Sequence, residues 1–233
     1  MLLRDMGHLF SRPLYRDGRL IVGNFDKGAS NQGLFSCNAQ TMRSLADCDR
    51  LPIDRQLGSM AWLSPVEIVG LEAGPTTDDP YSVVACSIPY GECRMLGQVP
   101  GVGSATTCVP AFDRVYVAVG QQMRSCAVSG QSGCARINSF GSDIGAFTSL
   151  GGSVFAGARA SKASIQKCAP DTADSCSLLN EGPYVSRLAP HGDRLLVGTY
   201  TWSDWNAPGI GGLYLRPVTG GTSTSVWHGQ PGG

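Results

Sequence analysis

The stretch SVFAGARASKASIQKCAPDTADSCSLLNEGPYVSRLAPHGDRLLVG, residues 153–198, holds one full period of an internal repeat. It begins with the apolar run Ser153–Gly157 and ends with the similar run Arg194–Gly198, 41 positions further on. Between them lie a run that ends at Cys168, a polar turn, a run that opens with Cys176, and one further strand-like run. Four such runs separated by turns within about 40 residues are typical of one β-propeller blade.

The same apolar run recurs along the whole chain. Its first residues lie 48, 47, 39 and 41 positions apart, which matches the spacing of four-stranded blades. Each run is preceded by one strand and followed by two more, and we name these strands a, b, c and d in chain order. One such unit cannot bury both of its faces alone, so neighbouring units are expected to stack radially. The five b runs are Arg19–Gly23, Glu67–Leu71, Arg114–Ala118, Ser153–Gly157 and Arg194–Gly198.

The sequence therefore predicts an all-β fold, a five-bladed β-propeller of four-stranded antiparallel blades, as a single domain over residues 1–233. In the first unit, residues 8–17 fill the strand a position. The composition agrees, because 31 Gly and 14 Pro residues supply many tight turns. The repeat is also compatible with part of a larger ring. The blades are expected at approximately 8–54, 55–101, 102–141, 142–181 and 182–229.

Eight of the nine cysteines form pairs that flank the c–d hairpin of the first four units. Facing positions on antiparallel strands lie about 4.5–5.5 Å apart, which suits a disulfide. Four disulfides would indicate an oxidising compartment. Zinc is the alternative, but it needs four converging ligands, usually in closely spaced pairs, whereas the spacers here are ten, six, seven and seven residues. We predict no metal and no cofactor. The predicted disulfides are Cys37–Cys48, Cys86–Cys93, Cys126–Cys134 and Cys168–Cys176.

The ninth cysteine, Cys108, falls at a strand a position that aligns with residues expected to pack in the interior. We therefore expect a free, buried thiol that behaves as a small hydrophobic side chain. A nucleophilic role is disfavoured because no histidine lies near it in the chain. The aligned residues are Pro13, Ala61, Phe147 and Leu188.

The segment Ser164–Cys176, followed by Arg194–Tyr200, resembles repeats in extracellular β-propeller proteins of bacteria and algae. Those repeats carry a cysteine pair in the outer hairpin of each blade and are more distantly similar to YWTD and NHL propellers. The resemblance covers residues from about 8 to about 228 but is specific only in the third and fourth units, because the first has a longer cysteine spacer and the fifth has no cysteines. It implies a secreted propeller, but it brings no catalytic residues, because propellers host many unrelated functions.

Charge and hydropathy exclude several partners. The chain has 18 basic and 18 acidic residues and no basic stripe, which disfavours nucleic acid and acidic membrane surfaces. No run of about 18 apolar residues exists, so no membrane insertion is predicted. Residues 1–8 lack the features of a signal peptide. We therefore expect a mature or excised domain of a secreted, extracellular or cell-surface protein, with its targeting segment elsewhere.

The candidate ligand site lies on loops. In a propeller the b–c and d–a loops emerge on one face, and the b–c loops are long in units one, two and five, at 24–32, 72–80 and 201–211. If the ring closes, these loops form one lobe. Aromatic, carboxylate and amide groups together suit the binding of sugars or of protein hot spots. Alternatively, the tryptophans pack in the interior, and the aspartates are solvated turn residues or hold calcium. The predicted ligand-binding residues are Trp202, Asp204, Trp205, Asn206, Asp26, Asp78 and Asp79.

No catalytic constellation stands out in the sequence. Paired-carboxylate hydrolysis needs two acidic groups on one face, and Asp78 with Asp204 is the least unfavourable pair. We therefore predict a non-catalytic binding module whose partner is a glycan or an extracellular protein. A structural cell-surface or scaffold repeat protein is the second hypothesis, and a glycosidase or lyase is the third.

Overall fold

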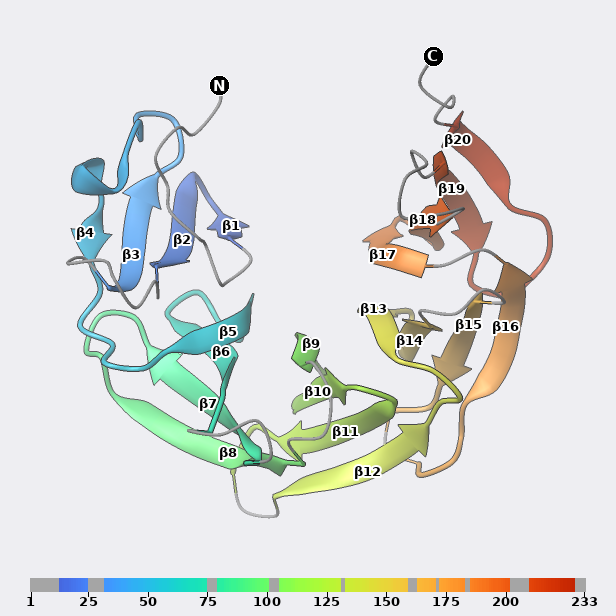
Figure 1. Cartoon of the computed structure of the whole chain (residues 1–233), viewed down its shortest axis with the longest axis horizontal. Coiled ribbons are helices and arrows are strands. Elements are labelled where there is room, and N and C mark those ends of the chain that lie inside the picture. The colour runs from blue at the N-terminus through green and yellow to red at the C-terminus, as the bar shows by residue number, and fades with distance from the viewer. Residues whose placement is uncertain are drawn as a thin grey trace. The chain divides into compact units, whose positions relative to one another are not determined.

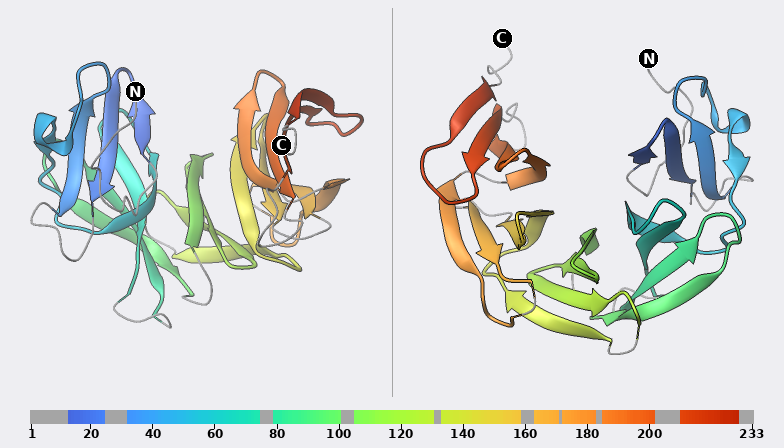
Figure 2. Two further views of the ribbon diagram at one scale, coloured as in Figure 1. Left: turned by 45° about the horizontal axis from the view of Figure 1, so that its top comes forward. Right: turned by 180° about the vertical axis from the view of Figure 1, so that it is seen from behind.

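The computed structural model of the chain forms five antiparallel sheets. Each sheet is built from four strands that follow one another in the sequence and lie side by side in that order (Figure 1, Figure 2). The fold class is thus all-β, a five-bladed β-propeller with four antiparallel strands in each blade, as predicted. The structure describes residues 13–24, 32–74, 79–100, 105–130, 133–158, 163–170, 172–182, 185–201 and 210–228.

The chain divides into two compact units, and the division passes through the third sheet. The first unit comprises Met1–Val115 and Cys126–Cys134. The second unit comprises Tyr116–Ser125 and Ala135–Gly233. The assignment of residues 1–233 to a single domain stays a prediction.

The first and second sheets lie in the first unit. The first sheet also carries a short 3-10 helix, Leu45–Asp47, in its c–d hairpin. The strands of the first sheet are β1 (Leu14–Arg16), β2 (Arg19–Asn24), β3 (Gly33–Asn38) and β4 (Asp49–Arg50). The strands of the second sheet are β5 (Leu57–Trp62), β6 (Glu67–Glu72), β7 (Tyr81–Ser87) and β8 (Cys93–Val99).

The remaining sheets follow the same order. The third sheet contains β9 (Ala105–Ala111), β10 (Arg114–Val119), β11 (Gln122–Ala127) and β12 (Cys134–Ser139). The fourth contains β13 (Ile144–Leu150), β14 (Ser153–Ala158), β15 (Ala163–Cys168) and β16 (Ser177–Gly182). The fifth contains β17 (Val185–His191), β18 (Arg194–Thr201), β19 (Ile210–Pro217) and β20 (Thr224–His228). Every aligned b run of the sequence is the second strand of its sheet.

Local sequence explains the hairpins and the b strands. The β1–β2 turn consists of Asp17 and Gly18, whose φ angles of 50° and 78° are those of a type I′ turn, which favours glycine at its second position. The b strands are apolar at consecutive positions rather than alternating, because both faces of the sheet are covered where they lie. In β14, for example, Val154, Phe155 and Ala156 are fully buried.

Consecutive sheets bury their faces against each other. In the first unit, Ile21 and Leu34 of the first sheet share one core cluster with Leu57, Ile68 and Cys86 of the second. In the second unit, the fourth and fifth sheets share a cluster that contains Phe155, Ile165, Val185 and Leu195. The expectation that neighbouring repeats cover each other's faces is therefore confirmed for the sheets within each compact unit.

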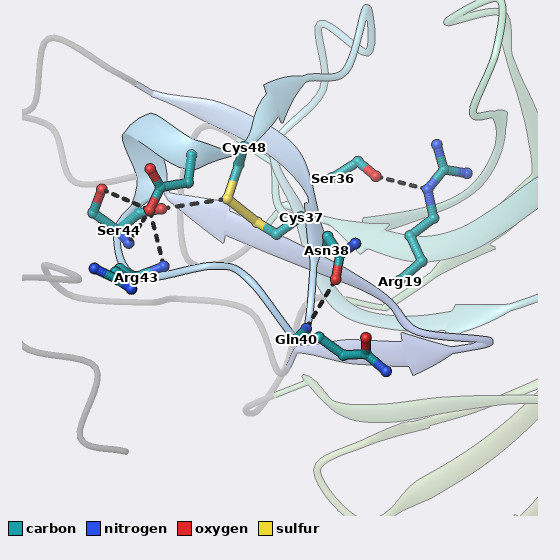
Figure 3. Close-up of a disulfide and its surroundings, with 9 residues drawn as sticks. Arg19, Ser36, Cys37, Asn38, Gln40, Arg43, Ser44 and Cys48 are labelled. Atoms are coloured by element: carbon teal, nitrogen blue, oxygen red, sulfur yellow. Dashed lines mark hydrogen bonds between the residues drawn. A yellow bond between two sulfur atoms is a disulfide. The ribbon is translucent and has the colours of Figure 1, made fainter.

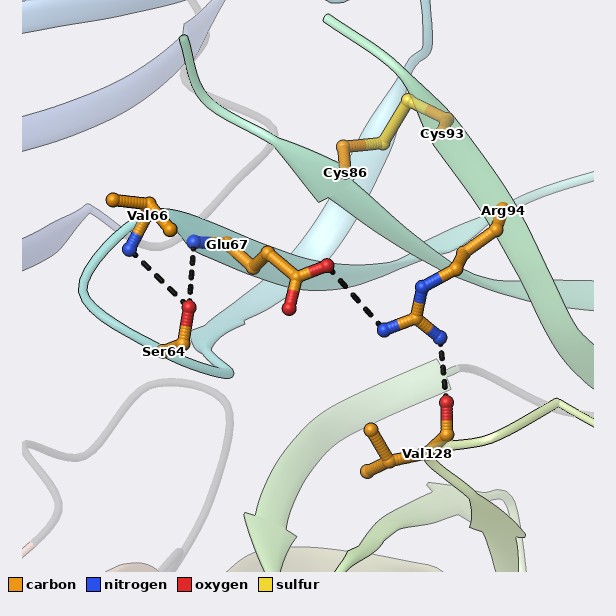
Figure 4. A network of polar contacts seen from close by, with 7 residues as sticks. All are labelled: Ser64, Val66, Glu67, Cys86, Cys93, Arg94 and Val128. Atoms are coloured by element: carbon orange, nitrogen blue, oxygen red, sulfur yellow. Dashed lines mark hydrogen bonds and ion pairs between the residues drawn. A yellow bond between two sulfur atoms is a disulfide. The ribbon is translucent and has the colours of Figure 1, made fainter. Parts of the chain in front are cut away.

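Polar contacts at the outer hairpins join neighbouring blades of the first unit. Arg94 on β8 forms an ion pair with Glu67 on β6, with its Nη2 3.3 Å from Oε1 (Figure 4). The same guanidinium donates to the carbonyl oxygen of Val128, which belongs to the next c–d hairpin. The Ser64 hydroxyl oxygen accepts the amides of Val66 and Glu67 and so shapes the a–b turn beside this pair. The pair is half-exposed, so its effect is to position the strands more than to stabilise the fold.

Four disulfides close the c–d hairpins of the first four blades, as predicted. Their Cα–Cα distances are 4.0 to 4.5 Å. In every pair the strand c cysteine is buried and its partner is partly exposed. The zinc alternative is wrong for these eight cysteines, because each sulfur is already bonded to another. The pairs are Cys37–Cys48, Cys86–Cys93, Cys126–Cys134 and Cys168–Cys176.

No helix in the described part of the chain is long and apolar enough to cross a lipid bilayer.

Candidate functional site

Most of the predicted ligand-binding residues lie outside the described part of the chain, so their role stays a prediction. Asp79 is described and is half-buried at the end of the β6–β7 loop. Its side chain lies against Gly74 so closely that a Cβ on Gly74 would overlap the Cβ of Asp79. The residues outside the described ranges are Trp202, Asp204, Trp205, Asn206, Asp26 and Asp78.

A polar hollow of about 490 Å³ lies in the first compact unit, on the face that carries the b–c and d–a loops. It is formed by the start of β3, the end of β4, the connection from β4 to β5 and the end of β6. Its volume is in the range of small-molecule sites. We call it the Arg50 hollow. Its lining residues are Gln32, Gly33, Arg50, Ile53, Asp54, Arg55, Gln56, Glu72 and Ala73.

An ion pair shapes one wall of the Arg50 hollow. Arg55 Nη1 lies 2.9 Å from Glu72 Oε2 and joins the β4–β5 connection to the end of β6. The register of the second sheet pairs Glu72 with Leu57, the first residue of β5, so the two segments meet at this edge. The Arg55 side chain is 48% exposed and that of Glu72 is 24% exposed. A pair this exposed contributes less than about 1 kcal/mol, so it orients the wall more than it stabilises the fold.

Arg50 forms the opposite wall, and a glycine determines how its side chain lies. A Cβ on Gly33 would sit 3.1 Å from Arg50 Nε and 3.6 Å from Nη2, so the guanidinium lies close against the start of β3. The φ of Gly33 is +139°, in a region that other residues rarely adopt. Within the described residues, no hydrogen bond or ion pair engages the Arg50 guanidinium. Its donors therefore face the hollow and the solvent.

The floor of the Arg50 hollow is apolar and its rim is balanced in charge. Ile53 is 3% exposed and belongs to the core that the first two sheets share. Above it, two guanidinium groups and two carboxylates, those of Asp54 and Glu72, give no net charge. The amides of Gln32 and Gln56 add groups that both donate and accept hydrogen bonds.

A second hollow of about 440 Å³ lies on the opposite face of the first blade, at its a–b and c–d turns. Here Arg19 Nε donates to Ser36 Oγ at 2.7 Å, and the backbone N–H of Gln40 donates to Asn38 Oδ1 at 2.9 Å (Figure 3). The Cys37–Cys48 disulfide lies beside these groups. The side chains of Arg19 and Ser36 bond to each other, and this hollow on the opposite face provides a control surface for the first.

Sequence reasoning missed Arg50, Asp54 and Arg55. A signal was present, because the d–a connection emerges on the same face as the b–c loops. The run from Asp49 to Gln56 holds four charged residues where the first blade passes to the second. Two of the predicted long loops do reach the hollow, which is lined by Gln32 at the end of the 24–32 loop and Glu72 at the start of the 72–80 loop.

Comparison with known proteins adds the fold and no more. No protein-family model and no curated protein matches the chain. A solved structure from Agrobacterium tumefaciens, described as a TolB, is 10% identical over 94% of this chain and 81% of its own, with a TM-score of 0.66. The computationally designed Ika8 protein is 11% identical over 94% of this chain and 73% of its own, with a TM-score of 0.56. Membership of the disulfide-bearing propeller repeat family therefore stays a prediction.

Proposed function

We propose that this chain is a secreted, non-catalytic module that binds a glycan on the face carrying the b–c and d–a loops. The Arg50 hollow supplies part of the binding surface. The four disulfides support the extracellular half of the proposal, because such bonds persist in oxidising compartments.

The balanced rim of the Arg50 hollow carries the proposal. A sugar hydroxyl both donates and accepts a hydrogen bond, so it is best matched where donors and acceptors alternate. Arg50 and Arg55 provide donors, whereas Asp54 and Glu72 provide acceptors, over the apolar floor at Ile53. Charge-assisted hydrogen bonds of this kind are about twice as strong as neutral ones.

The hollow fits a glycan better than a protein surface. Protein–protein hot spots are centred on large apolar or aromatic anchors that fill complementary pockets. Here the apolar lining is limited to Ile53, which is buried, and Ala73. A small polar ligand meets more of this lining than an aromatic anchor would.

The test is a glycan array followed by titration of the best ligand with Arg50→Ala. We expect the affinity to fall about tenfold or more, because a hydrogen bond to a charged group contributes about 1.5–3 kcal/mol. Arg50 is exposed, so the variant should fold normally. Gln40→Ala, on the opposite face, is the matched control and should bind like the wild type. Equal affinity of Arg50→Ala and wild type would remove the hollow from the site.

The predicted fifth-blade loop is tested in the same titration. Trp205→Ala is expected to lose binding at an unchanged melting temperature, because an aromatic ring stacks on the apolar face of a sugar. If the protein binds no glycan on the array, the proposal fails and a structural scaffold role is favoured.

A further inference from the structure

The c–d hairpin of the fifth blade contains no cysteine, although its register matches that of the others. In three other blades, the strand c cysteine pairs with the second residue of strand b. These register pairs are Leu20 with Cys37, Ile68 with Cys86, and Val154 with Cys168. The corresponding register pair in the fifth blade is Leu195 with Arg216. Arg216 therefore stands where the other blades have their first cysteine.

The outer strand identifies the second member of the pair. In the fourth blade, Lys167 pairs with Ser177, and the next positions outward are the bonded Cys168 and Cys176. In the fifth blade, Leu215 pairs with Thr224, and the next positions outward are Arg216 and Ser223. Their separation in sequence is seven positions, the same as that of Cys86 and Cys93.

Arg216 and Ser223 also bond to each other, and their burial matches that of a cysteine pair. Arg216 Nη1 donates to Ser223 Oγ at 2.5 Å, and Nη2 donates to the carbonyl oxygen of Gly221 at 3.1 Å. Arg216 is only 7% exposed and Ser223 is partly exposed, as the strand c and strand d cysteines are elsewhere. The planar guanidinium thus holds the turn with two donors in fixed geometry.

We infer that Arg216 and Ser223 replace the cysteine pair in the fifth blade, which gives this hairpin a closure that reducing agents do not open. A dithiol such as dithiothreitol transfers two electrons and two protons to each disulfide, which becomes two thiols, and the dithiol becomes a cyclic disulfide. The Arg216–Ser223 contact has no bond for this reaction to break. The chain therefore combines four redox-sensitive hairpins with one that is insensitive.

The first test introduces cysteines at these two positions, Arg216→Cys with Ser223→Cys. Oxidised glutathione should accept the two electrons and two protons of the new thiols and form a fifth disulfide, visible as a loss of two mass units. We expect the melting temperature to rise by about 5 °C under oxidising conditions and not under reducing ones. The control, Arg216→Cys with Thr222→Cys, lies one position off register and should stay largely unbonded. Failure of the first pair to bond, or equal bonding of both pairs, would overturn the assignment.

The second test needs no variant. Amide hydrogen exchange is measured on the wild-type chain with and without dithiothreitol. Exchange should accelerate in the c–d hairpins of the first four blades, whereas Thr224–His228 should keep its protection relative to them. Equal loss of protection in all five hairpins would contradict the inference.

Discussion

The Cys108 thiol is enclosed by backbone of the preceding blade. It contacts the carbonyl oxygen of Ser59, and its sulfur lies 3.6 Å from the carbonyl oxygen of Val69. The residue is free and 3% exposed, so the predicted buried packing role is confirmed. Burial raises the pKa of the Cys108 thiol from its ordinary value of 9.0 to about 12, because the thiolate would lose its hydration. At neutral pH the group is therefore a protonated thiol without access to solvent.

This raised pKa predicts a loss of stability in alkali. Below pH 9 the thiol is protonated in both the folded and the unfolded chain and has no effect on unfolding. Between pH 9 and about 12 only the unfolded chain releases the proton, so unfolding becomes easier as the pH rises. The loss should reach about 1 kcal/mol by pH 10.

The measurement compares thermal unfolding of the wild type and Cys108→Ala from pH 7 to pH 10. The variant starts less stable because it lacks the sulfur, but its stability should fall less steeply with pH. Parallel curves for the two proteins would contradict this account of the thiol.

Among the strands, Gly157 of β14 allows the fourth and fifth sheets to approach closely. Gly157 ends the run of β14, as Gly23 and Gly198 do in β2 and β18. A Cβ on Gly157 would lie 2.5 Å from Cγ1 and 2.8 Å from Cβ of Val185, which begins the next blade. Gly157 is therefore needed for the packing between the fourth and fifth sheets and not for a turn.

Gly157→Ala should destabilise the chain by about 1–3 kcal/mol, because the added methyl group forces the fourth and fifth sheets apart. Urea unfolding measures the change. Gly141→Ala is the matched control, since a Cβ there meets nothing within 4 Å, and its stability should be close to that of the wild type. A wild-type midpoint for Gly157→Ala would show that the two sheets adjust without cost.

At the scale of the whole molecule, the disulfides act chiefly on the unfolded chain. Each closes a short loop between neighbouring strands, and on the chain-entropy estimate such a loop contributes about 2.5 kcal/mol. The bonds lie in the outer hairpins, and two of them also take part in packing: Cys86 belongs to the core cluster around Ile68, and Cys37 belongs to the cluster with Val22 and Phe35. The covalent constraint on the unfolded chain therefore adds to the packing in which these cysteines take part.

Thiol labelling followed by non-reducing mass measurement counts these bonds. The native chain should take up no label, and the chain unfolded in guanidinium should take up one, on Cys108. A second label on the unfolded chain, or any label on the native chain, would contradict the assignment of four disulfides and one buried thiol.

Local sequence patterns are enough to predict the blades and their disulfides. The apolar b runs and the turns between them are local features, and β2, β6, β10, β14 and β18 begin at the residues where those runs begin. The cysteine spacing was sufficient to predict the disulfide pairs for the same reason, because each pair closes a single hairpin. The approximate blade limits stay a prediction.

The places where polar groups converge depend on the three-dimensional packing of the sheets. The Arg50 hollow combines β3, β4, the β4–β5 connection and β6, and the position of Arg50 depends on its contact with Gly33. The equivalence of Arg216 with a cysteine depends on a register that includes a bulge between Leu213 and Tyr214. The hollow arises from the meeting of segments distant in the chain, whereas the Arg216–Ser223 pair depends on the bulged register within one hairpin. No local pattern of apolar residues encodes either relation.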